Sequence, residues 1–475
     1  MSPQPSTFCS LLPLPDYPRG RHSFKKVPSY LWYEEEMHDF REAADPSVLY
    51  HDGAWYLYPS AGMAYVSTDF VTWTHHRMEP YDCGYAPTVE RFRGQFLLTA
   101  CQAGMWTSES PLGPFREIGP ILLPDGTPLG TPSDPGWSDP MLFADGDRLY
   151  AYWGIAHPGI FGAELDPEHP NRMLTAPKLL FSYNPEHEWE RLGEWNEDPT
   201  RSFVEGAWMV KNKGRYYLTY TAPGTTFSSY AMGCYTSDRP LGPFVYQSTN
   251  PILRQSAGLI RGPGHGSVVR GPNDTWWAFF TCTACNHHMY ERRVGVTPAG
   301  FDADGNLFAV PPSELPQRAP GLLPRPELGN SAGLLPVNMN RTPRASSKIP
   351  GREPRYATDS CMKTWWQAAP DDREPWLMVY LDNTYTMSAV SILWAEPDLA
   401  YDAGRTPTPM KYRLEYSMDA ADWKTALDAS TNETDLLIDY REFAPVSALW
   451  VRLHVLEVPP AGVGVIHLAV FGVKS

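Results

Sequence analysis

The chain has 475 residues, 42% hydrophobic and 20% charged, which excludes wholesale disorder and exceeds the length of one ordinary domain. Lysine and arginine number 39 and aspartate and glutamate 54, and a net charge of −15 argues against nucleic acid or an anionic membrane as partner. The 49 prolines, 17 tryptophans and 26 tyrosines favour short strands and turns over long helices. An acidic, aromatic-rich chain suits a neutral ligand with flat faces, such as a sugar.

Residues 1–34 are predicted to form an N-terminal extension without a signal peptide. Residues 1–9 lack a basic region followed by an apolar core, and Pro13, Pro15 and Pro18 interrupt the next segment. The most apolar stretch, 448–473, contains charged residues and a Pro-Pro pair, so it is not expected to span a membrane. Seven scattered cysteines, an odd number, argue against a disulfide framework. We therefore expect a cytoplasmic protein.

One pattern recurs five times within residues 35–310. Each copy has a small or acidic residue, a strand, a polar turn and an aromatic-rich strand, and the copies cover 44–58, 85–98, 138–152, 204–220 and 264–280. Turn residues such as Asp52-Gly53 and Asp145-Gly146 stand between two apolar runs, as in a β-hairpin. A spacing of roughly 40–65 residues with about four strands per copy predicts a five-bladed β-propeller. An open β-sandwich with accidental similarity is the alternative.

The composition changes after the last repeat. Residues 311–354 are rich in Pro, Gly, Arg and Ser, and we predict a linker that wraps or docks on the domains. Residues 355–475 contain runs in which apolar residues alternate with polar or aromatic ones, at 376–381, 389–394, 412–416, 449–455 and 466–471. These runs predict a second all-β domain, a jelly-roll-like sandwich. The predicted fold class is therefore all-β, with a five-bladed β-propeller followed by a β-sandwich.

Three of the five repeats begin their innermost strand with a carboxylate. These are Asp45, Asp139 and Glu205, whereas the second and fifth repeats carry Ala86 and His265. Equivalent positions of a propeller converge on its axis, and carboxyl groups that meet there repel one another, so one is held protonated while another is ionised. Glycoside hydrolysis needs an acid to protonate the leaving oxygen and a carboxylate to activate water or attack the anomeric carbon. Taken singly, each residue also fits a turn at a strand start.

The five strand starts together resemble glycoside hydrolase family 43. They read Ala-Asp45-Pro-Ser-Val, Tyr-Ala86-Pro-Thr-Val, Ser-Asp139-Pro-Met-Leu-Phe, Val-Glu205-Gly-Ala-Trp and Gly-His265-Gly-Ser-Val-Val. The resemblance covers about residues 35–310 and implies a five-bladed propeller and an inverting mechanism. It implies that Asp45 is the general base, Glu205 the general acid, and Asp139 the residue that tunes the acid's pKa and orientation. The related retaining fructosidase clan has an Asn-Asp-Pro-Asn opening and a Glu-Cys pair, which this chain lacks.

The resemblance also bears on cofactors. In the family, the histidine of the fifth blade often faces the axial channel, so His265 is the candidate for holding Ca²⁺ or a water there. No cofactor is expected to be required. Cys282, Cys285, His287 and His288 resemble zinc ligands, but four ligands within seven residues would struggle to surround one tetrahedral ion.

Several further side chains are candidates for substrate binding. They are Tyr85, Trp137, Trp153, Trp208, His287 and Arg292. The four aromatic residues lie near the carboxylates in the sequence and could stack on a sugar, but propeller cores need such rings too. The histidine is expected at the rim, and the arginine falls where the family often places one under the substrate. A surface salt bridge is the alternative for the arginine.

The C-terminal domain resembles the discoidin-like factor 5/8 type C modules, which are galactose-binding-like sandwiches. The motifs that carry this resemblance lie at 357–366, 376–382, 416–423 and 450–453. Cys361 and His467 stand where these modules often have acidic residues, which weakens the usual calcium site. A role in bracing the propeller therefore stands beside a lectin role.

The combined expectation is an inverting, exo-acting glycosidase that acts on oligosaccharides or polysaccharide fragments. The resembled family mostly releases α-L-arabinofuranosyl or β-D-xylosyl units, and galactosyl and galactofuranosyl variants are the alternative. A non-catalytic carbohydrate-binding protein is the alternative from another class. It would not need all three carboxylates, yet all three are present.

Overall fold

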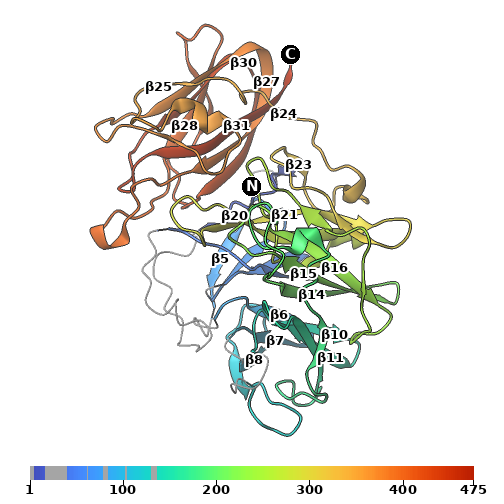
Figure 1. Cartoon of the computed structure of the whole chain (residues 1–475). Coiled ribbons are helices and arrows are strands. Elements are labelled where there is room, and N and C mark those ends of the chain that lie inside the picture. Colours follow the sequence, from blue (N-terminus) through green and yellow to red (C-terminus); the bar gives the residue numbers. More distant parts are fainter. Residues whose placement is uncertain (1–4, 16–39, 61, 79–83, 102–103, 130–135) are drawn as a thin grey trace.

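The computed structural model describes residues 5–15, 40–60, 62–78, 84–101, 104–129 and 136–475. In this part of the chain there are strands and short 3-10 helices but no α-helix, and no helix is long and apolar enough to cross a membrane. Figure 1 shows two bodies, a propeller below and a sandwich above. The predicted all-β fold class is confirmed.

Five antiparallel sheets form the propeller, each built from consecutive strands that run from the axis outward. Blade one holds β2 (Ser47–His51), β3 (Ala54–Tyr58), β4 (Met63–Ser67) and β5 (Thr74–Arg77). Blade two holds β6 (Thr88–Phe92), β7 (Gln95–Thr99), β8 (Gly104–Ser108) and β9 (Arg116–Pro120). Blade three holds β10 (Met141–Asp145), β11 (Arg148–Trp153), β12 (Ile160–Leu165) and β13 (Lys178–Phe181). Blade four holds β14 (Glu205–Asn212), β15 (Arg215–Ala222), β16 (Ala231–Ser237), β17 (Val245–Tyr246) and β18 (Leu253–Arg254). Blade five holds β19 (Val268–Arg270), β20 (Trp276–Thr283), β21 (Arg292–Phe301) and β22 (Leu307–Ala309).

Tight turns join the two inner strands of several blades. Between β2 and β3, Asp52 and Gly53 both have positive φ, as the two central residues of a type I′ hairpin require. Arg93-Gly94 and Lys213-Gly214 repeat this conformation in blades two and four. Glycine adopts positive φ at no steric cost, so one glycine per turn is enough to set the hairpin. The blade ring closes where Ser267 Oγ of blade five donates to the carbonyl of Pro46 in blade one at 3.0 Å.

The sandwich has one eight-stranded, folded-over sheet. Its main strands are β27 (Trp376–Trp394), β28 (Tyr412–Ser417), β29 (Lys424–Asp428), β30 (Ile438–Val455) and β31 (Gly464–Lys474), with the short strands β24 (Leu335–Pro336), β25 (Arg344–Ala345) and β26 (Trp366–Gln367) at its edges. The pairing of β27 with β30 shifts register after Tyr380 and again after Met387, and such bulges bend the long strands. The 3-10 helices are η2 (Glu188–Glu190), η3 (Pro272–Asp274), η4 (Pro326–Leu328), η5 (Pro354–Thr358) and η6 (Tyr401–Ala403).

The segment predicted as a linker divides between the two domains. Strand β23 (Gln317–Arg318) pairs with the N-terminal strand β1 (Thr7–Phe8), whereas β24 and β25 pair with β31 and β27 of the sandwich. The sandwich sheet therefore already begins before residue 355, the start expected from the composition. Backbone pairing with distant strands, which composition does not reveal, sets this boundary.

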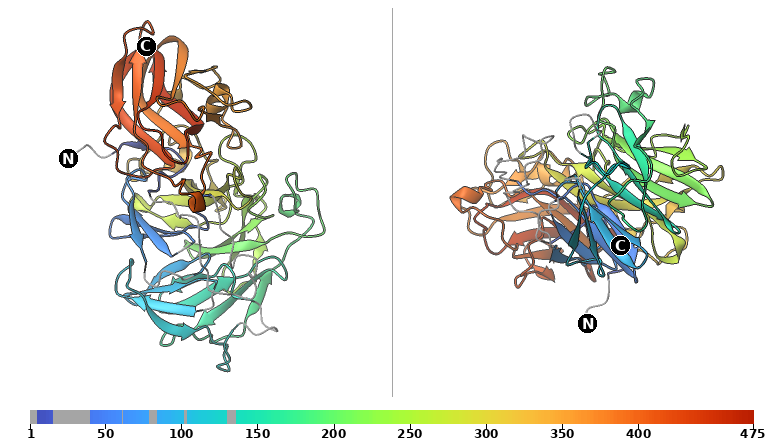
Figure 2. Two further views of the ribbon diagram at one scale, coloured as in Figure 1. Left: turned by 90° about the vertical axis from the view of Figure 1, so that its left-hand side faces the viewer. Right: turned by 90° about the horizontal axis from the view of Figure 1, so that it is seen from below.

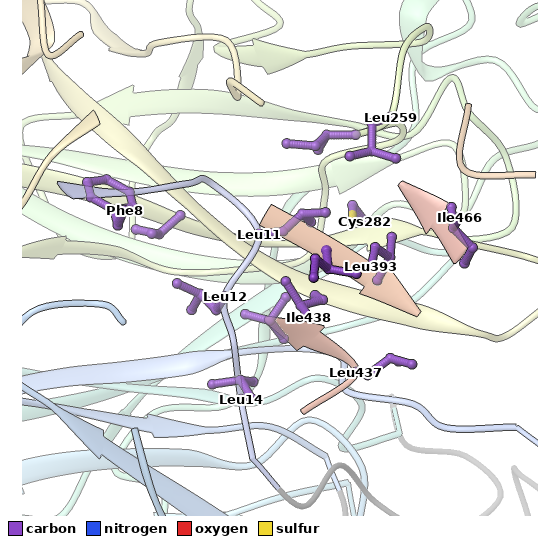
Figure 3. Close-up of a cluster of buried hydrophobic side chains, with 14 of the residues drawn as sticks. Phe8, Leu11, Leu12, Leu14, Leu259, Cys282, Leu393, Leu437, Ile438 and Ile466 are labelled. Carbon is purple, nitrogen blue, oxygen red and sulfur yellow. The ribbon is translucent and has the colours of Figure 1, made fainter. Parts of the chain in front are cut away.

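Part of the expected N-terminal extension fills the junction between the domains. Leu12 N donates to the carbonyl of Val294 at 3.0 Å, and Val296 N donates to the carbonyl of Ser10 at 2.8 Å, so residues 10–12 run antiparallel to β21 like an added strand. Figure 3 shows Phe8, Leu11, Leu12 and Leu14 in one cluster with Leu259 and Cys282 of the propeller and with Leu393, Leu437, Ile438 and Ile466 of the sandwich. In the left view of Figure 2, the sandwich stands on one edge of the propeller. One continuous apolar core thus joins the two domains, and Trp277 and Trp366 are fully buried in it.

Candidate active site

A pocket of about 170 Å³ opens where the innermost strands begin. Its walls comprise Asp45, Tyr85, Asp139, Ile155, Phe203, Glu205, Gly224, Thr225, Thr226, Phe227, His265, Tyr290 and Arg292. All three predicted catalytic carboxylates therefore lie in one cavity. The repeat places them there because each inner strand starts at the same height around the axis.

Four of the strand starts share a left-handed backbone. The residues are Asp45, Ala86, Asp139 and His265, with φ between 31° and 54°. In blade four, however, the left-handed residue is Gly206, with φ of 61°. A Cβ at Gly206 would lie 3.0 Å from the His265 ring and from Thr221 Oγ1, so glycine fits this close approach.

Glu205 therefore stands one residue earlier than the alignment predicted from the sequence. The carbonyl of Tyr85 accepts a hydrogen bond from Cys101 N, just after the second strand of its blade, and Glu205 pairs with Thr221 at the corresponding place in blade four. Glu205 thus corresponds to Tyr85 and not to Ala86. A bulge between Glu205 and Trp208 accommodates the difference. Glu205 nevertheless lies in the pocket, because both of these strand positions face it.

The surroundings of Asp45 favour the ionised form of its carboxyl group. It is only 5% exposed. It accepts hydrogen bonds from Ser60 Oγ at 2.8 Å and from Arg292 Nη1 at 2.9 Å, and His265 Nδ1 lies 3.2 Å away. Burial opposes ionisation of this carboxyl, but the charge of Arg292 and the His265 ring outweigh burial and hold its pKa below the usual value. A buried carboxylate with a lowered pKa suits a general base.

Glu205 has the opposite character. It is 7% exposed, and its Oε1 accepts a hydrogen bond of 2.6 Å from the hydroxyl of Tyr230, just before β16. Burial raises the pKa of Glu205 to about 7, the charge of Asp45 adds to this rise, and the hydrogen bond from Tyr230 opposes it. Below about pH 7, Glu205 therefore carries a proton that it can donate.

Asp139 interacts electrostatically with both other carboxyls. Burial raises the pKa of Asp139 to about 7, His265 opposes the rise, and the charges of Glu205 and Asp45 increase it. This interaction is reciprocal, so an ionised Asp139 also favours the protonated form of Glu205. Its backbone N–H donates to Cys101 Sγ at 3.3 Å, which fixes the strand start.

Two family models match the chain, one for each domain. The model for glycosyl hydrolases family 43 matches residues 33–307, more than half of the chain, and the model for the F5/8 type C domain matches 343–467. The chain belongs to glycosyl hydrolases family 43. It is therefore a glycosidase, and its substrate is a carbohydrate.

The family 43 enzyme is similar to several characterised proteins. It is 25% identical to a xylosidase/arabinosidase of Bacteroides ovatus over 56% of this chain and 94% of that one. It is 26% identical to a β-xylosidase of Xylanibacter ruminicola over 50% of this chain and 76% of that one. A solved glycoside hydrolase structure covers 91% of this chain and 98% of its own, with a TM-score of 0.51 and 19% identity, which supports the fold.

Arg292 of the family 43 enzyme lies in the pocket, and the predicted alternative of a surface salt bridge is wrong. Its Nε donates to Glu42 Oε1 at 2.8 Å while Nη1 donates to Asp45, and the side chain is buried. The hydroxyl of Tyr85, also a pocket residue, lies 3.4 Å from Glu42 Oε2. Of the six predicted substrate-binding residues, Tyr85 and Arg292 therefore line the pocket.

The other four predicted substrate-binding residues do not line the pocket. Trp137 and Trp153 pack against each other in the apolar core of blade three, with ring centroids 4.9 Å apart, and Trp153 has no exposed surface. Trp208 donates to the carbonyl of Val268 and lines the axial channel below the pocket. His287 faces the sandwich, where its ring stacks on Trp365 at 6.2 Å. The three tryptophans are near the carboxylates in the sequence, but the strand pleat directs them elsewhere, and the path of its loop brings His287 to the sandwich.

Several neighbours of the three carboxyl groups were not predicted from the sequence. They are Glu42, Ser60, Ile155, Phe203, Phe227, Tyr230 and Tyr290. Ser60 and Cys101 lie just after the second strands of blades one and two, and Thr281 lies near the end of the second strand of blade five. Each of these side chains accepts the backbone N–H of the next strand start around the ring. This Ser, Cys or Thr, about fifteen residues after the strand starts of blades one, two and five, is the signal that the sequence offered.

The surroundings of His265 decide how well a metal centre would fit there. No group of three or more His, Cys, Asp or Glu side chains that could hold a metal ion occurs in the part of the chain that the structure describes. Below the pocket, a cavity of about 20 Å³ between His265, Ser47 and Thr88 is large enough for one water molecule. His265 Nδ1 lies 3.2 Å from Asp45 Oδ1 and 3.8 Å from Asp139 Oδ2, so this nitrogen interacts with the two carboxyl groups.

We expect opposite shifts of the pH profile from two substitutions around Glu205. Tyr230→Phe removes a hydrogen bond that lowers the pKa of Glu205, so the alkaline limb should move to higher pH by up to about one unit. Asp139→Asn removes a repelling charge, so the limb should move to lower pH by a similar amount. The measurement is kcat/KM against pH, with Tyr183→Phe, whose hydroxyl is bonded to Pro199, as control. Shifts in the same direction would contradict these roles.

Proposed function

We propose that the protein is an inverting, exo-acting glycosidase that releases a terminal α-L-arabinofuranosyl or β-D-xylosyl unit from oligosaccharides. The observation that carries the proposal is that two carboxyls in one pocket have opposite surroundings: Arg292 and Ser60 donate to Asp45, whereas the neutral hydroxyl of Tyr230 donates to the buried Glu205. The pKa of Asp45 is accordingly lowered and that of Glu205 raised to about 7. The names of the similar proteins, xylosidase/arabinosidase and β-xylosidase, support the choice of sugar.

The proposed reaction is a single displacement. Glu205 donates its proton to the glycosidic oxygen as the bond to the anomeric carbon breaks. Asp45 accepts a proton from water, whose oxygen forms the new bond on the opposite face of the ring. Asp139 favours the protonated form of Glu205, and Arg292 keeps Asp45 charged. Activity should fall as pH rises through about 7, where Glu205 loses its proton, and as pH falls through the lowered pKa of Asp45, where the base is lost.

Exo action is supported by the size of the pocket. Its volume of about 170 Å³ lies below the range of about 300–1,000 Å³ that is typical for ligand pockets. The three carboxyls line this small cavity, so a single terminal sugar fits better than an internal stretch of polymer.

A second candidate is release of a galactofuranosyl unit. A β-D-galactofuranosidase of Aspergillus niger is 24% identical over 56% of this chain and 82% of that one. The same acid and base would serve either sugar, so the distinction depends on the pocket wall of Ile155, Phe203 and Phe227.

We also propose that the enzyme works in the cytoplasm and requires no cofactor. Free thiols at Cys9, Cys234, Cys282, Cys285 and Cys361 suit a reducing compartment. The channel cavity beside His265 has room for a water or an ion such as Ca²⁺, and no step of the proposed reaction passes through it.

A panel of chromogenic aryl glycosides tests the proposal. We expect hydrolysis of the arabinofuranoside or the xyloside, and proton NMR at early time points should show a first product of inverted anomeric configuration. The Asp45 and Glu205 carboxyl groups should then stand roughly 6.5–9.5 Å apart, which leaves room for the water. A first product of retained configuration would refute inversion. Cleavage of the galactofuranoside alone would select the second candidate.

A further inference from the structure

Two adjacent backbone segments connect the pocket with the domain junction. Residues 41–43 lie beside the start of β21, where Ala43 N donates to the carbonyl of Arg292 at 3.3 Å and Arg293 Nη1 donates to the carbonyl of Arg41 at 2.9 Å. Successive side chains of an extended chain point to opposite sides. Glu42 and Arg292 accordingly meet at the pocket, whereas the next side chains along, Arg41 and Arg293, lie away from it.

Arg41 reaches across the junction to the sandwich. Its Nε donates to Glu396 Oε2 at 2.8 Å, its Nη2 to Glu396 Oε1 at 2.5 Å, and its Nη1 to Asp435 Oδ2 at 2.8 Å. The Arg41 side chain is 1% exposed, and both carboxylates belong to the sandwich. The residue that precedes Glu42 is therefore held by a buried ion cluster of the other domain.

A pocket loop makes a second connection. Residues 284–291 carry Tyr290, which lines the pocket. Glu291 folds this loop, because its carboxylate accepts the backbone N–H groups of Asn286 and His287 and pairs with Arg293 at 2.7 Å. His287 in turn stacks on Trp365 of the sandwich. The sandwich therefore contacts both segments that flank Arg292.

We infer that the sandwich positions the catalytic base, because Glu396 and Asp435 hold Arg41 and thereby keep Glu42 and Arg292 aligned on Asp45. This inference rests on the proposed function, in which Asp45 is the base. A guanidinium buried without its carboxylates is costly, and a shift of residues 40–43 toward water relieves that cost. The same shift moves Glu42 away from Arg292, which then loses the partner that aims it at Asp45. Glu396 and Asp435 are thus positioning residues and touch no substrate.

The charged and titratable groups around Asp45 determine what such a shift changes. Asp45 faces Arg292, His265, Glu42, Asp139, Glu205 and Tyr230. Arg292 is the positive group whose alignment depends on Glu42. When Arg292 moves away, the negative neighbours and burial remain, so the ionised form of Asp45 becomes less favourable.

The test uses the full chain with Glu396→Gln and Asp435→Asn, singly and together. We expect kcat/KM on the active aryl glycoside to fall about tenfold in the double variant, with the acid limb of its pH profile moved upward by about one unit. Each single variant should shift the limb less. Glu396→Asp, which keeps the charge, should restore most of the profile. The matched control is Glu457→Gln, which removes an exposed ion pair with Lys411 on the same sandwich and should leave the profile unchanged.

A readout independent of turnover accompanies the kinetics. In protein labelled with carboxyl-¹³C aspartate, the Asp45 signal, assigned by its loss in Asp45→Asn, should titrate at higher pH in the double variant than in the unaltered protein. If the melting temperature falls while the Asp45 titration and the acid limb stay in place, the sandwich only stabilises the fold and the inference is overturned. Absence of hydrolysis with any glycoside would reject the proposed function, while the Asp45 titration would still decide the inference.

Discussion

Replacement of Glu205 by glutamine is expected to slow the release of poor leaving groups by about 10²–10⁴-fold. Glutamine keeps the size of the side chain and can still contact Tyr230, but it has no proton to donate to the glycosidic oxygen. An oligosaccharide leaves as an alkoxide unless it is protonated, so its departure depends on Glu205. An activated aryl group leaves with little protonation, so aryl glycosides should lose far less activity.

The measurement is kcat/KM for a series of aryl glycosides of increasing leaving-group pKa, together with an oligosaccharide. In Glu205→Gln, kcat/KM should fall more steeply as the leaving-group pKa rises. For activated substrates, the alkaline limb of the pH profile near pH 7 should disappear. Glu188→Gln, at an exposed position in η2, is the matched control and should change neither. Equal losses on all leaving groups would show that Glu205 is not the acid.

Replacement of Asp45 is expected to cause a loss of similar size, about 10²–10⁴-fold, but for every leaving group. The base activates the water and not the departing group, so aryl glycosides should lose as much activity as oligosaccharides. Two substitutions fit the left-handed backbone, which has φ of 54°. Asparagine keeps the shape, and glycine adopts this conformation without strain and opens space above Arg292.

Azide distinguishes loss of the base from general damage. In Asp45→Gly the anion can enter the vacated space beside Arg292 and attack the anomeric carbon directly, while Glu205 still protonates the leaving oxygen. We expect azide to raise the rate and to yield a glycosyl azide of inverted configuration, which NMR identifies. Asp147→Asn, 91% exposed in its side chain, is the control. A lack of rescue in both Asp45 variants, or a rescued product of retained configuration, would contradict the assignment of the base.

Much of the fold was predictable because its signals lie in neighbouring residues. A hairpin turn such as Asp52-Gly53 and the apolar runs on either side occupy about fifteen consecutive residues, and five copies of that unit can only bury their faces against one another in a ring. The three carboxylates were predictable for the same reason, because each one opens a repeat. The family assignment required no more than these short motifs in their order.

The partners of the carboxylates depended on the tertiary structure. Glu42 and Tyr230 stand in no fixed local relation to Arg292 and Glu205, the side chains that they bond, and only the closure of the ring and the path of the loops bring these pairs together. The same limit applies to the N-terminal residues 5–15, whose leucines pack against residues of both domains that are distant from them in the sequence.

The sequence by itself therefore determined the repeat, the all-β class and the identity of the three carboxylates. Only the tertiary structure decided which face each aromatic ring occupies and where blade four departs from the others. In a strand, a shift of one residue moves a side chain to the opposite face. The bulge after Glu205 and the left-handed Gly206 shift blade four by one residue but leave Glu205 in the pocket, whereas the strand pleat directs Trp137 and Trp153 into a blade core. These outcomes follow from pairing and packing between strands, which no single segment encodes.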